Sequence, residues 1–244
     1  MLPRRDARIW IIGASAGIGA ALARALAAEG ARLVLSARDA QALEALAQDC
    51  PGARALPLDL ARPGALAEAV AELAAPFDAI ICTAALYEPG PVAELDPAQA
   101  ELLVRVNLLG TLEVARLCPP LLRPGGQLVL FGSVAGYFGL PGGQAYSATK
   151  AAVNNLAETL RVELAPRVDV RLVCPGFVRT RLTARNRFRM PGLITPEEAA
   201  RHTLRGLRGR QFEIHFPKRL TLAMKLLRLL PYALSLRLTA RLLR

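Results

Sequence analysis

The sequence predicts an α/β fold in which a parallel, doubly wound sheet carries helices on both faces. Up to Phe216, short apolar runs typical of buried strands alternate with alanine-rich stretches of helical periodicity. Strands and helices in alternation form parallel βαβ units with right-handed crossovers. A chain of 244 residues fits one domain of this class. We therefore expect one α/β domain over residues 1–217 and a C-terminal extension over residues 218–244.

The first strand and the segment after it have the pattern of a phosphate-binding turn. Residues 8–12 form the strand, Gly13, Gly17 and Gly19 follow in the spacing G-x-x-x-G-x-G, and an alanine-rich helix comes next. Glycines allow a tight turn and a close approach of the backbone, and a helix N-terminus offers free amides to a pyrophosphate. This segment predicts a Rossmann-type dinucleotide site, although a glycine-rich helix entry also serves packing alone.

The second strand, residues 32–36, ends just before Arg38. At this point of a dinucleotide-binding fold an acidic residue binds the ribose 2′-hydroxyl of NAD, whereas an arginine accommodates the 2′-phosphate of NADP. Asp39 comes one residue later and is interpreted as the N-cap of the next helix, which runs to Gln48. Arg38 therefore predicts NADP(H) in preference to NAD(H).

Strands and helices continue to alternate through the middle of the chain. Asp59, just beyond the third strand, either bonds an adenine or lies in an ordinary surface turn. Asn107 lies inside the longest helix among apolar residues, where a buried amide needs partners, so it bends the helix or holds a water. Thr195 is the predicted cap of a later helix that begins with a proline. The other expected elements are the strands 53–57, 78–82, 127–131 and 211–216 and the helices 63–74 and 97–118.

A serine, a tyrosine and a lysine follow the strand 127–131. Ser133 comes two residues after its end, at the edge where ligands of open α/β sheets bind. Tyr146 and Lys150 are four residues apart in a helical pattern, so they share one face of a helix. A nearby cation lowers the pKa of a phenol, which can then exchange a proton with a carbonyl or alcohol oxygen that Ser133 also hydrogen-bonds. Each motif alone occurs by chance, but together they predict carbonyl reduction or its reverse.

In combination, these motifs and the run 175–180 resemble the short-chain dehydrogenase/reductase family over roughly residues 7–182, and more loosely to about residue 216. The resemblance implies that Tyr146 is the catalytic acid/base, that Ser133 polarises the substrate oxygen and that Lys150 holds the nicotinamide ribose and depresses the pKa of Tyr146. Asn107 would anchor a proton-relay water. The residues implied to bind the cofactor are Gly13, Ser15, Gly17, Ile18, Gly19, Arg38, Asp59, Ala84, Tyr146, Lys150, Pro175, Gly176, Val178 and Thr180.

The chain departs from that family at two places. Ile12 replaces the usual threonine before the first glycine, and residues 82–85, Cys-Thr-Ala-Ala, replace the usual Asn-Asn-Ala-Gly after the fourth strand. The usual asparagine and glycine stabilise the central sheet and let the backbone approach the cofactor. Thr83 keeps a hydroxyl, whereas Ala85 adds a methyl group.

Basic side chains are concentrated at the end of the chain. Residues 1–176 carry 15 basic and 17 acidic side chains, and residues 177–244 carry 16 basic and 3 acidic. Such a block favours an anionic partner, in general a membrane surface, a nucleic acid or a phosphorylated substrate. The family resemblance implies that the loop after Thr180 covers the substrate. Its arginines either bind an acidic substrate group or form a solvated face; they are Arg181, Arg185, Arg187 and Arg189.

The extension from Lys218 has seven basic residues and no acidic residue. Its leucines crowd one side up to Pro231, and basic residues recur after it, which predicts two short amphipathic helices. Such helices lie on an anionic membrane or dock on their own domain or on a second subunit. Lys225 and Arg228 interrupt any run long enough to span a bilayer. We favour the membrane-surface interpretation over docking, because basic amphipathic helices with this many leucines lie in the interface of an anionic membrane.

The composition indicates a cytoplasmic protein. The four cysteines lack metal-ligand spacing and are expected to be reduced, buried thiols, and neither histidine has a metal-binding partner. The first apolar run is too short for a signal peptide. We expect no nucleic acid partner, and a homodimer or homotetramer.

The leading hypothesis is an NADP(H)-dependent oxidoreductase that interconverts a carbonyl and an alcohol on an apolar, lipid-like substrate. One alternative is a 3-oxoacyl-thioester reductase, which the arginine loop would suit. An alternative of another class is a non-catalytic NADP-binding or membrane-associated regulatory protein.

Overall fold

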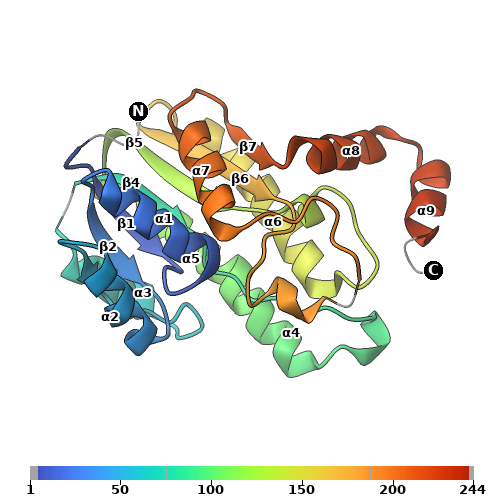
Figure 1. The fold of residues 1–244 in the computed structure, drawn as a ribbon, viewed down its shortest axis with the longest axis horizontal. Helices are drawn as coiled ribbons and strands as arrows, with labels where there is room; N and C mark the ends of the chain where they lie inside the picture. The colour runs from blue at the N-terminus through green and yellow to red at the C-terminus, as the bar shows by residue number, and fades with distance from the viewer. Residues whose placement is uncertain (1–4, 75, 187, 242–244) are drawn as a thin grey trace.

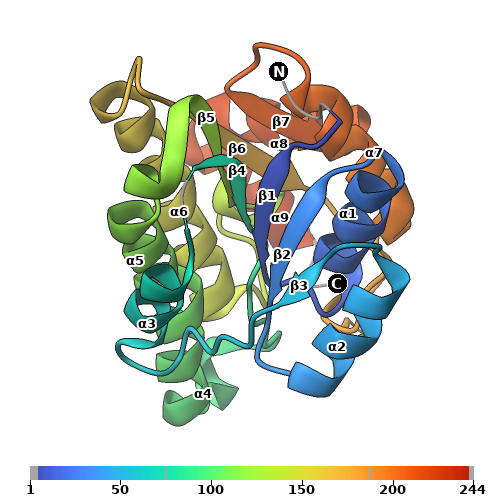
Figure 2. The ribbon, with the colours of Figure 1, turned by 90° about the vertical axis from the view of Figure 1, so that its left-hand side faces the viewer.

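The computed structural model describes residues 5–74, 76–186 and 188–241. Within them, seven strands form one sheet in the order β3-β2-β1-β4-β5-β6-β7 (Figure 2), and every pair of neighbouring strands is parallel. The predicted doubly wound α/β fold is thereby confirmed. The strands are β1 (Arg8–Ile12), β2 (Arg32–Ser36), β3 (Arg54–Ala55), β4 (Phe77–Cys82), β5 (Leu122–Phe131), β6 (Val168–Pro175) and β7 (Glu213–Phe216).

Helices cover both faces of the sheet (Figure 2). On one face lie α1 (Gly17–Ala28), α2 (Ala40–Asp49) and α7 (Pro196–Leu207). On the other lie α3 (Ala65–Glu72), α5 (Gly110–Leu117) and α6 (Gln144–Glu163). The short helix α4 (Pro97–Val104) precedes α5, and 3-10 turns precede β5 and follow Ser133.

Strand β1 shows why the sheet needs two helical layers. Ile9 and Ile11 belong to the core beneath α1 and α7, whereas Trp10 and Ile12 belong to the core beneath α3, α5 and α6. Successive strand residues point to opposite faces, so a strand that is apolar throughout must be buried on both sides. The continuous apolar run of the sequence is thus a direct signal of this layered arrangement.

The order of the strands sets the position of a binding crevice. Strand β1 lies between β2 and β4, so the chain moves outward from β1 in opposite directions in its two halves. Ligands of such sheets bind outside the carboxyl ends of the strands at this switch point. The glycine turn follows β1 and Ser133 follows β5, so both lie at this edge of the sheet.

Several predicted elements differ from those observed, and the strand expected over 127–131 begins five residues earlier, at Leu122. The strand expected over 53–57 is only Arg54–Ala55, since Pro57 has no amide hydrogen for a ladder. The chain nonetheless stays beside β2, with Leu56 N donating to Leu35 O at 2.8 Å. The helix expected over 97–118 is divided by a π-helical turn at Arg105–Leu109, and Asn107 lies within that turn. A π turn in a helix often accompanies a functional site.

After β7 the chain forms two further helices, α8 (Lys218–Leu229) and α9 (Tyr232–Ala240), which we call the C-terminal arm. The break falls at Leu230 and Pro231, so the prediction of two short helices joined at the proline is confirmed. Figure 1 shows the arm leaving the sheet beyond β7. None of the described helices is both long and apolar enough to cross a membrane.

Candidate active site

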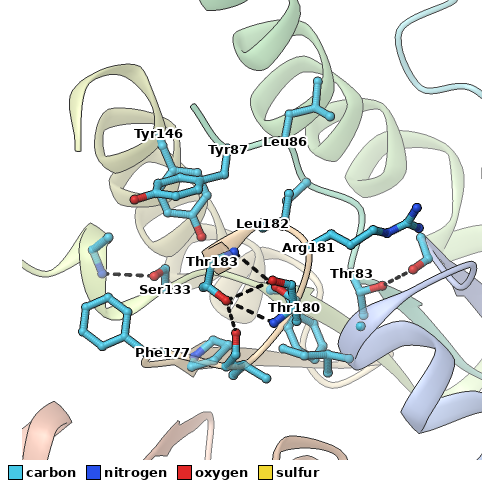
Figure 3. A pocket seen from close by; sticks show the side chains of 18 of the residues that line it. Thr83, Leu86, Tyr87, Ser133, Tyr146, Phe177, Thr180, Arg181, Leu182 and Thr183 are labelled. Atoms are coloured by element: carbon cyan, nitrogen blue, oxygen red, sulfur yellow. Dashed lines mark hydrogen bonds between the residues drawn. The ribbon is translucent and has the colours of Figure 1, made fainter. Parts of the chain in front are cut away.

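A pocket of about 970 Å³ lies at the carboxyl edge of the sheet. Its wall contains the glycine turn, Arg38, Ser133 and Tyr146, so the phosphate-binding pattern and the serine–tyrosine pair share one cavity. Figure 3 shows Ser133 and Tyr146 on one side of it and Thr83 on the other. Every residue predicted to bind a cofactor lines this pocket except Lys150.

The glycine turn is built so that side chains cannot be added. Gly13 has φ +94°, and a Cβ there would lie 2.4 Å from Ala84 N. A Cβ on Gly19 would lie 2.2 Å from the carbonyl oxygen of Gly13. Helix α1 begins at Gly17, and its N-cap Ala16 offers no side-chain hydrogen bond. The first amides of α1 therefore face the pocket edge without a side-chain cap, as a pyrophosphate group requires.

Thr83 supports this turn from the neighbouring strand. Its hydroxyl donates to the carbonyl oxygens of Gly13 at 2.9 Å and Ile12 at 3.1 Å, which share its one hydrogen. The amides of Thr83 and Ala84 also donate to Ile12 O, at 2.8 and 3.1 Å. The segment that departs from the family pattern thus still ties the end of β4 to the end of β1, because one hydroxyl bridges two carbonyl groups.

Arg38 and Asp39 have separate environments. Asp39 accepts a hydrogen bond from Ala42 N at 2.9 Å, so its predicted role as the N-cap of α2 is confirmed. Arg38 is exposed and lines the pocket, and among the described residues it has no ion pair. Asp59 also lines the pocket, and its carboxylate accepts from Ala61 N at 2.9 Å, as a residue of a surface turn does.

Ser133 and Tyr146 come from two neighbouring elements. Ser133 begins the 3-10 turn Val134–Gly136, and its Oγ accepts a hydrogen bond from Ala135 N at 3.1 Å. Tyr146 lies in the first turn of α6, and the ring of Tyr87 meets its ring edge-on with centroids 4.8 Å apart. Because Oγ only accepts in that bond, the hydroxyl hydrogen of Ser133 can face the Tyr146 hydroxyl, which it also hydrogen-bonds.

Lys150 and Asn107 lie behind the pocket wall. The Lys150 ammonium donates to the carbonyl oxygen of Phe131 at 2.8 Å and lies 5.8 Å from the centroid of the Tyr146 ring. Asn107 exchanges two hydrogen bonds with the backbone of Leu86, accepting at 2.7 Å and donating at 2.9 Å, and also donates to Thr149. The side chain of Asn107 therefore holds the segment after β4 in place. Of the two roles open from the sequence, an irregularity of the helix at Asn107 is present, in the form of the π-helical turn.

The expected effect of Lys150 on Tyr146 is not found. Burial raises the pKa of Tyr146 to about 12, and the Ser133 hydroxyl lowers it by less. Burial also lowers the pKa of Lys150 to about 8. Both shifts have the same origin, since low-dielectric surroundings disfavour the charged form of each group. In this arrangement Tyr146 is a protonated phenol at neutral pH, which is the state that a proton donor needs.

Three residues of the pocket have no signal in the sequence. The Tyr87 hydroxyl donates to Asn186 at 2.6 Å, which ties the segment after β4 to the loop after β6. Thr183 Oγ1 accepts from Thr180 N at 3.0 Å, and its own hydroxyl donates to Val178 O. These contacts shape the loop that carries Arg181 and Arg189 into the pocket wall. Arg187 lies outside the described residues.

The fold and the pocket together define a dinucleotide-binding oxidoreductase of the doubly wound α/β class. The family model of the short chain dehydrogenases matches residues 7–190, and the chain belongs to this short-chain dehydrogenase/reductase family. It is an NAD(P)-dependent oxidoreductase.

Curated relatives are similar over most of the chain. It is 32% identical over 195 residues to dehydrogenase/reductase SDR family member 7B of Bos taurus. This match covers 73% of this chain and 60% of the bovine protein. It is 31% identical over 232 residues to an uncharacterized oxidoreductase of Myxococcus xanthus, with 91% of each covered. It is 30% identical over 223 residues to ketoacyl reductase HetN of Nostoc sp., and the match covers 84% of this chain and 77% of that protein. The chain thus spans less than two thirds of the bovine relative.

Solved structures share the fold. A short chain dehydrogenase from Burkholderia cenocepacia in complex with NADP has a TM-score of 0.82 and 30% identity, with 98% of each chain covered. A short chain dehydrogenase/reductase from Burkholderia phymatum in complex with NAD also has a TM-score of 0.82, with 92% of this chain and 94% of that chain covered. The second is 23% identical, so it supports the fold alone.

Proposed function

We propose that the enzyme interconverts a carbonyl and an alcohol on an apolar, lipid-like substrate and uses NADP(H) in preference to NAD(H). The observation that carries this proposal is the shared pocket, in which the glycine turn and the exposed Arg38 stand opposite Ser133 and Tyr146. A phenol and a hydroxyl at one end of a dinucleotide site suit proton transfer to an oxygen beside a hydride transfer.

The residues that would hold the cofactor fit its chemistry. The glycine turn and the uncapped start of α1 accept phosphate groups, and Arg38 pairs with a 2′-phosphate. When bound, NADP(H) supplies or accepts the hydride. Val178 and Thr180 line the pocket beyond the end of β6, where they would cover the nicotinamide end. Lys150 uses one of its three N–H donors on the carbonyl oxygen of Phe131, so two others could bind a ribose hydroxyl.

The chain's own contribution to carbonyl reduction is proton transfer and polarisation. Ser133 donates a hydrogen bond to the substrate oxygen, which stabilises the negative charge that develops there. Tyr146 then gives its proton to the same oxygen, and its raised pKa keeps that proton in place until an alkoxide forms. The side chain of Asn107 holds the backbone of Leu86, which is part of the pocket wall, in place. We propose this positioning role for Asn107 in addition to the relay water that the family resemblance implies.

The walls near Ser133 favour an apolar substrate. Val134, Leu140, Leu220 and Met224 line this end of the pocket, and they also pack together in one apolar cluster. A screen of long-chain aldehydes, ketones and sterol-like ketones, followed by loss of NADPH absorbance, tests the proposal. Turnover of several such compounds is expected, and a full panel without NADPH oxidation would contradict it.

A 3-oxoacyl-thioester reductase is the second candidate. Arg181 and Arg189 line the pocket beside the loop that follows β6, and they would meet the phosphates of a thioester carrier. The ketoacyl reductase of Nostoc sp. is 30% identical to this chain. Acetoacetyl-coenzyme A in the same assay distinguishes the two, because only the thioester reductase prefers it to a plain ketone of similar chain length.

Replacement of Arg38 by alanine tests the cofactor preference. The guanidinium would contact only the 2′-phosphate, so Arg38→Ala should weaken NADPH binding by about tenfold to a hundredfold, as the loss of a charged hydrogen bond does. NADH binding should hardly change. Fluorescence titration with both cofactors measures this, with the exposed Arg116→Ala on α5 as a control for charge. Equal losses for NADPH and NADH would exclude Arg38 as the determinant.

We also propose that the C-terminal arm contacts an anionic membrane from the cytoplasmic side. On α8, Leu222, Leu226 and Leu229 are 56%, 62% and 81% exposed and recur with helical spacing. Basic residues and no acidic residue accompany them. A second copy of the arm would carry the same positive charge, which argues against self-pairing through it. The homodimer or homotetramer that we expect would therefore form elsewhere on the chain.

Substitution on the exposed face of α8 tests this contact better than truncation. Met224 is buried and Leu220 lines the pocket, so loss of the whole arm would also open the core. Leu222, Leu226 and Leu229 replaced together by serine should abolish co-sedimentation with phosphatidylglycerol vesicles and leave thermal unfolding unchanged. Val162→Ser, at a 79% exposed position on α6, is the control. Wild-type protein should also bind these vesicles less at high salt, because salt screens the charges. Wild-type protein that does not co-sediment with the vesicles at low salt would refute the proposal.

A further inference from the structure

A half-buried acidic residue connects the C-terminal arm to the turn that carries Ser133. Glu213, the first residue of β7, accepts a hydrogen bond from the Tyr137 hydroxyl through one carboxylate oxygen and pairs with the Lys225 ammonium through the other. The Lys225 ammonium also lies 5.4 Å from the centroid of the Tyr137 ring. We call these three residues the Tyr137–Glu213–Lys225 cluster. It joins the Ser133 turn to β7 and α8, which follow it by 76 residues or more.

Tyr137 ends the turn that Ser133 begins. Ser133 is the N-cap of the 3-10 turn Val134–Gly136 and Tyr137 is its C-cap. Gly136 N donates to Ser133 O and Tyr137 N donates to Val134 O, each at 3.0 Å. Ala135 N also donates to Ser133 Oγ, and Asn154 Nδ2 of α6 lies 3.5 Å from Ser133 O, so the turn is short and is held mainly at the Ser133 end. The side chain of Tyr137 anchors one end, and the end of β5 anchors the other.

Lys225 lies on the face of α8 that packs on the domain. Met224, its neighbour, is buried, and Leu220 is one turn earlier; both line the pocket and pack with Val134. The ion pair with Glu213 thus holds in place the helix that supplies the apolar wall opposite the Ser133 turn. One carboxylate therefore contacts both the residue that ends the Ser133 turn and the helix that carries part of the apolar pocket wall.

The charges of the cluster are matched and partly shielded from water. The side chain of Glu213 is 22% exposed and that of Lys225 is 38% exposed. Burial alone would raise the pKa of Glu213, but the hydrogen bonds from Lys225 and Tyr137 outweigh it and hold the pKa below its ordinary value. Burial raises the pKa of Tyr137, so its hydroxyl stays protonated and donates. An ion pair at this depth is sensitive to the loss of either partner, because the other charge is left unpaired.

We propose that Glu213 is a positioning residue for carbonyl polarisation, which sets the Ser133 turn through Tyr137 and the apolar wall of helix α8 through Lys225. This inference rests on the proposed function, since it assumes that Ser133 contacts the substrate oxygen. A displacement of about 1 Å in such a contact costs up to about a hundredfold in rate. Glu213 itself lies outside the pocket wall and touches no reacting atom.

Steady-state kinetics with NADPH and dodecanal separate this role from a general effect on stability. Glu213→Gln should lower kcat by about tenfold or more while the KM for NADPH stays unchanged, since the glycine turn is remote from the cluster. Tyr137→Phe should lower kcat in the same direction. Arg219→Met removes a cation from the exposed side of the same helix and should leave kcat at the wild-type value. The inference would be overturned if Glu213→Gln had the same kcat as Arg219→Met.

Two further measurements test the inference independently of the single-variant kinetics. Hydrogen exchange of the peptide covering residues 132–140 should quicken in Glu213→Gln and not in Arg219→Met, whatever the substrate. The double exchange Glu213→Lys with Lys225→Glu should restore part of the kcat lost in Glu213→Lys alone, because it rebuilds the ion pair that holds α8, whereas the hydrogen bond that Tyr137 donates stays broken. Unchanged exchange in Glu213→Gln would refute the link to Ser133. Failure of the proposed function has a different signature, namely wild-type protein that oxidises no NADPH while the exchange difference persists.

Discussion

Replacement of Tyr146 by phenylalanine should lower carbonyl turnover by about a hundredfold to ten-thousandfold, the contribution of a positioned general acid. The phenol lies at one end of the pocket, and its pKa of about 12 leaves it protonated at neutral pH. NADPH binding should be almost unchanged, because the glycine turn and Arg38 lie at the other end of the site. Stopped-flow measurement of NADPH oxidation, beside a fluorescence titration, reports the two effects separately.

The matched control for this prediction is Tyr232→Phe. Tyr232 begins α9 and is 64% exposed, so the same chemical change there should leave turnover at the wild-type value. A Tyr146→Phe variant with near-normal kcat would rule out Tyr146 as the proton donor. A variant that lost NADPH binding as well would indicate a structural role for the hydroxyl.

Lys150→Met should make the protein more stable and nearly inactive. Burial lowers the pKa of Lys150 from 10.5 to about 8, so a charged lysine at pH 7 destabilises the folded state by about 3 kcal/mol. Part of the gain is offset, because the carbonyl oxygen of Phe131 loses its donor at 2.8 Å. We expect the free energy of unfolding to rise by about 1–2 kcal/mol and turnover to fall by about a hundredfold.

The pH dependence of stability gives an independent check on this buried lysine. Because its folded-state pKa is about 8 and its ordinary value is 10.5, the unfolded chain binds more protons between those two values. The penalty is fully present below about pH 8 and is relieved as the pH rises towards 10.5. Denaturant unfolding of wild type and Lys150→Met should therefore converge over this window. A constant difference across it, or a variant less stable at pH 7, would contradict the prediction.

The C-terminal arm links two of the proposals through one helix. The inner face of α8 closes the pocket with Leu220 and Met224, and its outer face exposes Leu222 and Leu226. The docking and membrane interpretations of the sequence are thus compatible, because they concern opposite faces. Substitutions on the outer face should affect vesicle binding first, whereas substitutions in the Tyr137–Glu213–Lys225 cluster should affect kcat first.

The sequence by itself determined the layered fold and much of the pocket wall. Strands apolar on both faces require two layers of helices, and parallel strands bring their carboxyl ends to one edge. The turn after β1 and Ser133 after β5 therefore had to meet there, and a spacing of four residues placed Tyr146 and Lys150 on one face of α6. Asp39 and Thr195 also carried enough local information to identify their helix caps.

Only the tertiary structure decided how the charged and polar groups of the site behave. Burial raises the pKa of Tyr146, and the Lys150 ammonium binds the carbonyl oxygen of Phe131, whereas the sequence predicted that Lys150 would lower that pKa. Asn107 binds the backbone of Leu86, 21 residues away, and Tyr137 binds Glu213 across 76 residues. Periodicity and spacing report local geometry, but desolvation and pairing between distant segments exist only after the elements pack. The same physical reason leaves the two faces of α8 indistinguishable until the domain beneath it is known.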